Sequence, residues 1–245
     1  MGEQITKSRL LLALGAIAFA LIGAVGGWAW EKSRSAGSNK AAVERIVRAY
    51  LLEHPEVLPE AMDALRTKEQ RRQLAGAGDA VEAPFPGAVL GNPAGKVTLV
   101  EFTDYACTFC KRSVADVAAL VAANPDLKVV IRELPILSPD SVEAARWALA
   151  AAEQGRYAAF HDAMFRIGKP DGATIAAAAS AAGLDMERAR RAIADPRIEA
   201  ELQRNLAFAR QLGFDGTPSW IAGEAMMSGA VGEAELARAI AAARI

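Results

Sequence analysis

Two cysteines separated by two residues, Cys107 and Cys110, lie where an apolar strand passes into a helix. The β-branched and apolar run from Val97 to Phe102 predicts a buried strand, and the helical spacing of apolar residues predicts a helix from Lys111 to Ala123. The free amides and the positive dipole end at a helix start stabilise a thiolate relative to a thiol. We therefore expect Cys107 to be an exposed nucleophile. Cys110, about one turn further along the helix, is placed to attack a mixed disulfide on Cys107.

Other uses of a cysteine pair are a half zinc site and an incidental local disulfide. The chain has no other cysteine, and its histidines are His54 and His161, so a metal site lacks further soft ligands. A disulfide across two residues closes a small loop and constrains the unfolded chain little. These points favour a redox centre that needs no cofactor and no metal. A copper- or zinc-handling protein with the same dithiol and a membrane-tethered assembly protein are the alternative classes.

The N-terminal region predicts a membrane anchor within residues 1–36. About 21 residues without charge, Leu10 to Trp30, would span about 31 Å as a helix, which matches a bilayer core. The alternative is a cleaved signal peptide, but no convincing Ala-x-Ala site follows the apolar stretch. The net charge of −1 gives no footprint for nucleic acid. We expect an uncleaved single-pass membrane anchor, whose orientation stays open because positive charges flank both of its ends.

Residues 37–77 predict a short helical segment, broken near His54–Pro55 and Pro59. Apolar residues recur at helical spacing along it: Val43, Ile46, Val47, Tyr50, Leu58, Met62 and Leu65. This stripe needs a partner, either the body of the same subunit or a second copy of the chain, in which case the segment is an oligomerisation stalk.

Residues 78–245 predict an α/β domain. The expected strands cover 88–90, 97–102, 127–134, a segment after Gly216 that runs to Ala222, and 225–228, and a closing helix covers 233–243. Between them, residues 138–213 read as an all-helical insertion punctuated by glycines and by Asp195–Pro196. The fold class is therefore α/β, a thioredoxin-like fold with an inserted helical subdomain.

Four stretches in this order resemble the DsbA family. They are Glu-Phe-Thr-Asp-Tyr-Ala-Cys-Thr-Phe-Cys-Lys at 101–111, Arg-Glu-Leu-Pro at 132–135, Gln-Gly-Arg-Tyr-Ala-Ala-Phe-His at 154–161 and Gly-Thr-Pro at 216–218. The resemblance implies a thiol:disulfide oxidoreductase of the bacterial periplasm, with Cys107 as nucleophile and Cys110 as resolving thiol. It implies that the Thr217–Pro218 bond is cis and faces the cysteines, where an ordinary trans turn is the alternative. It also implies that Glu101 is a buried acid that handles the proton of Cys110, where a salt-bridged or edge glutamate is the alternative.

The sequence departs from the strongest oxidases of this family between the two cysteines. Thr108 and Phe109 stand there in place of Pro-His, so a positive imidazole is absent. Thr217 before the proline instead resembles members that reshuffle disulfides, and residues 50–61 resemble the helical region of ScsC-like and Com1-like members. The implied partners are exported proteins with cysteines, a membrane redox partner that resets the pair, and other copies of the chain in a homo-oligomer. Oxidase and isomerase directions both stay open.

Overall fold

The structure, a computed structural model, describes residues 21–28, 30 and 40–244. The chain divides into two compact units, residues 1–65 and residues 66–245. Within the described residues, no helix is both long enough and apolar enough to cross a membrane. The predicted anchor over residues 1–36 falls for the most part outside the described residues.

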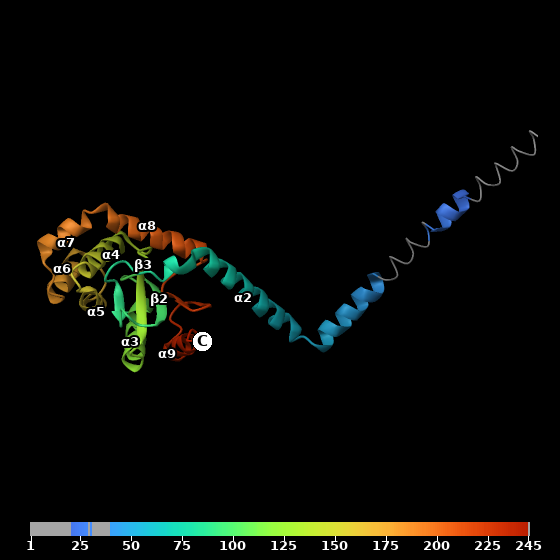
Figure 1. The fold of residues 1–245 in the computed structure, drawn as a ribbon, viewed down its shortest axis with the longest axis horizontal. Coiled ribbons are helices and arrows are strands. Elements are labelled where there is room, and N and C mark those ends of the chain that lie inside the picture. The colour runs from blue at the N-terminus through green and yellow to red at the C-terminus, as the bar shows by residue number, and fades with distance from the viewer. Residues whose placement is uncertain (1–20, 29, 31–39, 245) are drawn as a thin grey trace, which may run out of the picture. The chain divides into compact units, whose positions relative to one another are not determined.

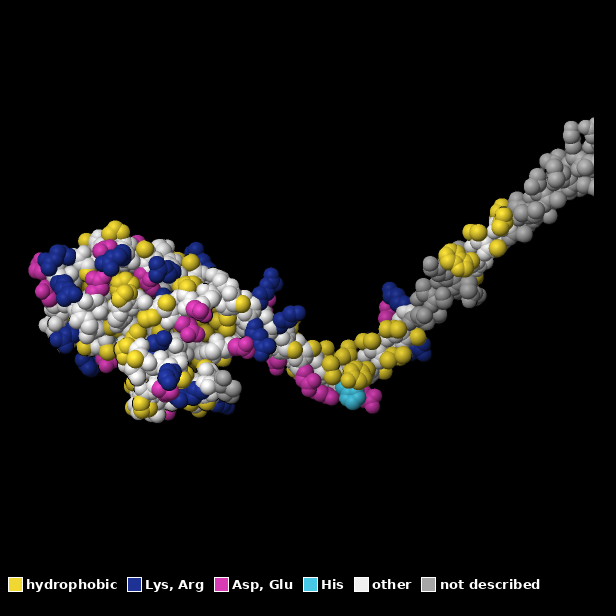
Figure 2. All heavy atoms as spheres, viewed as in Figure 1, with side chains coloured by type: hydrophobic (Ala, Val, Ile, Leu, Met, Phe, Trp, Pro, Cys, Tyr) yellow, Lys and Arg dark blue, Asp and Glu magenta, His cyan; other side chains and the backbone are white. Residues whose placement is uncertain are grey.

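The first unit contains a helix over residues 40–53 and the beginning of helix α2 (Val57–Ala77). The chain leaves the helical conformation at 54–56, which confirms the predicted break at His54–Pro55. The predicted break at Pro59 is wrong, because Pro59 lies in the first turn of α2. Amides in the first turn have no acceptor within the helix, so the missing N–H of proline costs no hydrogen bond there. The apolar stripe of the helix over residues 40–53 is largely exposed, as the yellow side chains in Figure 2 show.

The second unit is built on a five-stranded sheet in the order β1-β3-β2-β4-β5. Its strands are β1 (Val89–Gly91), β2 (Val97–Thr103), β3 (Leu127–Glu133), β4 (Ser219–Ala222) and β5 (Ala225–Ser228). The central strands β2 and β3 are parallel and are joined by helix α3 (Thr108–Ala123), while all other pairs are antiparallel. This β-α-β unit and the hairpin β4–β5 confirm the arrangement predicted from the sequence.

The predicted insertion is all-helical, and four of its five helices begin at a side-chain cap. It contains α4 (Pro139–Ala152), α5 (Tyr157–Ile167), α6 (Gly172–Ala181), α7 (Met186–Ile193) and α8 (Pro196–Gln211). Asp195 accepts an amide hydrogen at the start of α8, and Pro196 is the first residue of that helix, as the sequence predicted. Ser138 does the same at the start of α4, before Pro139. Gly183 and Gly213 follow α6 and α8 with φ of 69° and 71°, the left-handed conformation that ends a helix.

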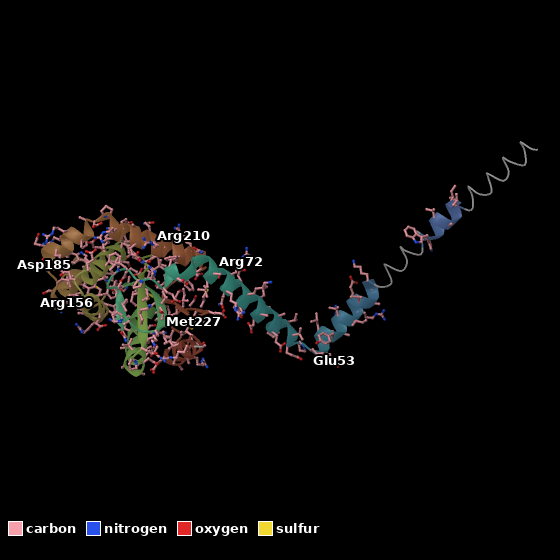
Figure 3. All side chains as sticks on the ribbon, viewed as in Figure 1. Glu53, Arg72, Arg156, Asp185, Arg210 and Met227 are labelled. Carbon is pink, nitrogen blue, oxygen red and sulfur yellow. The ribbon has the colours of Figure 1, made fainter. Side chains whose placement is uncertain are left out.

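The sheet separates two apolar layers because side chains alternate between its faces. One face packs against α3, α4, α5 and the closing helix α9 (Glu233–Ala242). The other face, with Val100 and Phe102, packs against the end of α8, the end of α2 and the short 3-10 helix η1 (Gly78–Val81). Figure 1 shows the strands between α8 and α3, and Figure 3 shows the side chains that fill the layers. The second unit has a thioredoxin-like fold with a helical insertion.

Candidate functional site

Cys107 and Cys110 lie at the start of α3, which begins at Thr108, three residues before the predicted Lys111. Cys107 is the N-cap residue, and its sulfur accepts the amide hydrogen of Cys110 at 3.5 Å. The helix extends this far back because the cap supplies an acceptor to an amide that lacks a partner within the helix. A negative charge that forms on the Cys107 sulfur therefore faces helix amides and the positive end of the helix dipole.

The loop before β4 lies against Cys107. The Cys107 thiol donates a hydrogen bond to the carbonyl oxygen of Thr217 at 3.2 Å, and the Thr217–Pro218 peptide bond is cis. Both features are those that the family resemblance implied. This loop also explains why the prediction of an exposed nucleophile was wrong, because Cys107 is only 7% exposed beneath it.

Cys110 is completely buried behind Cys107, close to the carboxyl group of Glu101 on β2. Burial raises the pKa of the Cys110 thiol far above its usual range, and the nearby Glu101 charge raises it further. Glu101 is 3% exposed, and burial raises the pKa of its carboxyl group to about 8. Near neutral pH this group is largely a carboxylic acid, so it is able to give a proton to a Cys110 thiolate.

Two threonine hydroxyls also act on Cys110. Thr103 on β2 and Thr217 in the loop both lower the pKa of the Cys110 thiol, against the effect of burial, by hydrogen bonding to its thiolate form. In the described part of the chain neither hydroxyl oxygen has a hydrogen-bond partner while Cys110 is a thiol. A buried hydroxyl without a partner is unusual, and here each becomes a donor when charge forms on the sulfur.

Asp104 holds the turn that leads into α3, and sequence reasoning missed it. One carboxylate oxygen accepts the amide hydrogen of Ala106 at 2.8 Å, and the other accepts those of Ile136 and Leu137 at 2.9 and 3.0 Å. Asp104 is 1% exposed and fixes the active-site turn to the loop between β3 and α4. An aspartate that starts a turn is a recognisable signal, but its second pair of contacts lies more than 30 residues away.

A second polar group inside the same core was also missed. Glu133 is fully buried, and one of its oxygens accepts hydrogen bonds from Tyr157 at 2.6 Å and Tyr105 at 3.0 Å. The Tyr105 hydroxyl also lies 3.3 Å from Nδ1 of His161, which is 2% exposed. Burial raises the pKa of Glu133 to about 8 and lowers the pKa of His161 to about 4. All four residues lie in the stretches that resemble the DsbA family, at 101–111, 132–135 and 154–161, but the sequence did not show that they contact one another.

The two residues between the cysteines lie at the surface. Thr108 is exposed, and Phe109 is 52% exposed with the guanidinium carbon of Arg112 5.0 Å from its ring centroid. The structure thus brings Cys107, Cys110, Glu101, Thr217 and Pro218 together. Thr108 and Phe109 instead form part of the surface around them.

Arg132, which neighbours Glu133 on β3, belongs to the opposite face of the sheet. It is buried and donates to Glu201 at 2.7 Å and to the carbonyl oxygens of Ala80, Val81 and Ala83. These bonds join β3 to α8 and η1, so Arg132 is structural. Within the described residues, no group of three or more His, Cys, Asp or Glu side chains is arranged to hold a metal ion.

The family model of the DSBA-like thioredoxin domain matches residues 98–241, more than half of the chain. The chain belongs to the DSBA-like thioredoxin domain family. Its members include thiol–disulfide oxidoreductases, which are enzymes. A second model, the copper resistance protein ScsC N-terminal domain, matches residues 39–72 and confirms the resemblance to ScsC-like members of this DsbA family.

Solved structures of DsbA-family proteins and relatives share the fold. A thioredoxin-like oxidoreductase from Silicibacter pomeroyi DSS-3 is 42% identical, with a TM-score of 0.65 over 68% of this chain and 96% of that chain. The thiol-disulfide exchange protein alpha-DsbA2 from Wolbachia pipientis is 26% identical, with a TM-score of 0.66 over 73% and 97%. Proteus mirabilis ScsC in a transitional conformation is 28% identical, with a TM-score of 0.65 over 84% and 97%.

Curated relatives match this DsbA-family chain over part of their length. The Na(+)/H(+) antiporter NhaA 3 of Salinispora tropica is 30% identical over 127 residues, which are 51% of this chain and 20% of that protein. The chain therefore spans about a fifth of the length of the curated relatives that it matches.

Proposed function

We propose that this protein is a thiol:disulfide oxidoreductase that forms or reshuffles disulfides in exported proteins through Cys107 and Cys110. The observation that carries the proposal is the hydrogen bond from the Cys107 thiol, at the cap of α3, to the carbonyl oxygen of Thr217. It places one sulfur between a helix start, which stabilises negative charge, and the backbone of the loop that would pair with a substrate chain.

Oxidation of a substrate begins from the Cys107–Cys110 disulfide. A substrate thiolate attacks the sulfur of Cys107, the bond between the two cysteines breaks, and Cys110 leaves as a thiolate. A second substrate thiolate then attacks the substrate sulfur of the mixed disulfide and displaces Cys107. Two electrons pass from the substrate to the cysteine pair, and the substrate gains a disulfide.

Cys110 needs a proton when it leaves, because its buried site disfavours the thiolate. The carboxylic acid of Glu101 supplies this proton and becomes a carboxylate, and the Thr103 and Thr217 hydroxyls stabilise the charge in transit. In the reverse direction the Glu101 carboxylate removes the proton from Cys110, which then attacks Cys107 of a mixed disulfide and releases the substrate.

Reshuffling starts from the reduced pair. The Cys107 thiolate attacks a wrong disulfide of the substrate, the released substrate thiolate attacks another disulfide, and Cys107 is recovered without net electron transfer. The exposed Phe109 and the backbone of Thr217 beside Cys107 would contact the substrate chain, which pairs with the loop as an added strand.

We place the catalytic domain in the periplasm, held to the inner membrane by a single-pass anchor within residues 1–36. The uncharged stretch from Leu10 to Trp30 and the absence of cysteines other than the redox pair support this location. Each oxidation of a substrate leaves the cysteine pair reduced. A membrane redox partner would then have to return the pair to the disulfide.

We also propose that the helical segment over residues 37–77 joins several copies of the chain. Val43, Ile46, Val47 and Tyr50 form one apolar face of the helix over residues 40–53, and all four are about half exposed or more. Several dithiols around a shared cleft would act on one substrate at high effective concentration, which suits reshuffling.

Turnover by full-length variants tests the proposed chemistry. The oxidised protein is mixed with a reduced peptide that carries two cysteines, and formation of the peptide disulfide is followed for the wild type and for Cys107→Ser and Cys110→Ser. We expect neither variant to turn over, since each lacks the internal disulfide. Full turnover by Cys107→Ser would overturn the assignment.

A further inference from the structure

Three polar residues interrupt the apolar face of the sheet beneath the two cysteines. In the β2–β3 ladder, Thr103 pairs with Glu133 and Glu101 pairs with Ile131, so all four side chains point to the same face. Thr103 lies two residues from Glu101 on its own strand and is the register partner of Glu133 on the next. Thr103 therefore lies between the two carboxyl groups.

Two atoms of these register partners have no hydrogen-bond partner in the described part of the chain. They are the hydroxyl oxygen of Thr103 and Oε2 of Glu133, both shielded from solvent. Buried polar atoms are almost always hydrogen-bonded, so two exceptions on paired residues call for a shared explanation. A proton that moves between the carboxyl groups would use both atoms.

The other oxygen of Glu133 connects to the surface. Tyr105 has one hydroxyl proton and donates it to Glu133 Oε1 at 3.0 Å. The contact of 3.3 Å between the Tyr105 hydroxyl and Nδ1 of His161 is then a hydrogen bond donated by the Nδ1–H tautomer of the imidazole. His161 lines a groove of about 270 Å³ between β1, α3 and α5, whose rim includes the exposed Ala158 and Asp162. A continuous series of contacts thus leads from this groove to Glu133.

We propose that Glu133 is a second proton-holding residue of the redox centre, which exchanges protons with Glu101 across Thr103 and with the groove through Tyr105 and His161. This inference rests on the proposed function, in which Glu101 gives a proton to Cys110. Glu133 touches no reacting atom and acts through Glu101, so it is a positioning residue.

The transfer is balanced and moves no electrons. After Glu101 has protonated Cys110, the Glu133 carboxyl group passes its proton through the Thr103 hydroxyl to the Glu101 carboxylate. Tyr105 then gives its proton to Glu133 and receives the Nδ1 proton of His161, while Nε2 of His161 takes a proton from water in the groove. One proton has moved from solvent to the sulfur of Cys110. Tyr105 and His161 each hold as many protons as before, and His161 is left as the Nε2–H tautomer.

The charges around Glu133 suit this role. Burial raises its pKa to about 8, and the charges of Asp104 and Glu101 raise it as well, against hydrogen bonds from Tyr157 and Tyr105. The two buried glutamates therefore resist being ionised together, and a charge formed on one draws the proton of the other. Because burial lowers the pKa of His161 to about 4, its imidazole is neutral near pH 7 and passes a proton without storing charge.

Tyr105 and Tyr157 offer a matched pair of variants. Each donates one hydrogen bond to the same oxygen of Glu133, but only Tyr105 has a hydrogen-bond contact with His161 among the described residues. The measurement is infrared spectroscopy of the full-length protein transferred into D₂O, which follows the conversion of the protonated carboxyl bands to their deuterated forms. The bands are assigned with Glu101→Gln and Glu133→Gln.

We expect deuteration of the Glu133 carboxyl group to slow by about tenfold or more in Tyr105→Phe and in His161→Phe. In Tyr157→Phe the band should shift while the exchange rate stays within about twofold of the wild type, since only a bond outside the path is lost. We also expect Glu133→Gln to shift the pH profile for reduction of the Cys107–Cys110 disulfide, which a purely structural role would not do. His161→Phe keeps the test decisive if Tyr105→Phe does not fold.

Equal exchange rates in Tyr105→Phe, His161→Phe, Tyr157→Phe and the wild type would overturn the path, as would a spectrum in which Glu133 is ionised at neutral pH. Failure of the proposed function would give a different experimental result. In that case the wild-type protein does not exchange disulfides with a substrate, whatever the carboxyl bands show.

Discussion

The Cys107 thiol lies 3.2 Å from the carbonyl oxygen of Thr217, although 110 positions separate the two residues. The sheet brings them together, because β4 pairs antiparallel with β2 and Ser219 is the register partner of Phe102. The end of β2 leads to Cys107, and the start of β4 follows Pro218. These two strand ends therefore lie side by side at the same end of the sheet. Any substrate bonded to Cys107 has the backbone of Thr217 beside it.

Replacement of Thr103 should affect stability and activity differently, because its buried hydroxyl has no hydrogen-bond partner among the described residues. Thr103→Val keeps the side-chain shape and removes a buried oxygen that has no partner, so the free energy of unfolding should rise or change by less than about 1 kcal/mol. A hydrogen bond to a charged group contributes about 1.5–3 kcal/mol, so reduction of the Cys107–Cys110 disulfide should slow by about tenfold or more. Denaturation and the rate of reduction by excess dithiothreitol measure the two effects.

The matched control is Thr103→Ser, which keeps the hydroxyl and should reduce the disulfide at nearly the wild-type rate. A large loss of stability in Thr103→Val, or an unchanged rate of reduction, would show that the hydroxyl does not serve Cys110.

The buried carboxyl groups predict how stability depends on pH. The pKa of both Glu101 and Glu133 rises from 4.5 to about 8 on folding, so between these values the folded chain binds more protons than the unfolded chain. The free energy of unfolding should therefore fall as pH rises, by up to about 1.4 kcal/mol per pH unit for each group. His161 acts in the opposite sense between about 4 and 6.5, because its pKa is lowered. The fall should thus be clearest from pH 6.5 to 8.

Urea denaturation across this range measures the slope. Glu101→Gln and Glu133→Gln should each make it shallower, whereas the exposed Glu187→Gln on α7 should leave it unchanged. A wild-type stability that is flat or rising from pH 6.5 to 8 would contradict the protonation states given to both carboxyl groups.

Local sequence patterns predicted most of the fold because strands, helices and stops are specified by neighbouring residues. The strand before Cys107, the hairpin at 219–228 and the helix ends at Gly183 and Gly213 are of this kind. Pro59 was misjudged because the tolerance of a helix for proline depends on where the helix begins, which the pattern left uncertain by a few residues.

The candidate site was predictable only where its residues lie in one motif. Cys107 and Cys110 share one motif, whereas the role of Glu101 and the cis bond at 217–218 came from the family resemblance. The bonds that join Glu133 to Tyr105 and Tyr157 connect positions 28 and 24 residues apart, on elements that meet only through tertiary packing. A buried glutamate in a strand also gives no sign of its partners in the sequence.

Asp104 should contribute more to stability than an exposed aspartate. Asp104→Ala removes the acceptor of three backbone amides, and we expect the free energy of unfolding to fall by about 3 kcal/mol or more, since hydrogen bonds to a charged group are strong. Asp126→Ala is the control because it loses a partly exposed ion pair with Arg244, which is worth about 1 kcal/mol or less. Equal losses in the two variants would rule out the positioning role of Asp104.

The apolar face of the helix over residues 40–53 predicts a change in oligomeric state. Val47→Lys places a charge in the centre of this face and should convert the proposed oligomer to monomers, which light scattering detects. Ala41→Lys adds the same charge on the opposite side of the helix and should leave the oligomer intact. A wild-type protein that is monomeric at high concentration would contradict self-association through this segment.

The most direct test of the central claim is to trap the covalent intermediate. Full-length Cys110→Ser is mixed with a peptide that contains a disulfide, and the adduct is located by mass spectrometry. The account predicts a stable mixed disulfide on Cys107, because the resolving thiol is gone, and a much smaller adduct on Cys110 in Cys107→Ser, because Cys110 is buried and protonated. No adduct on Cys107, or equal adducts on the two cysteines, would contradict it.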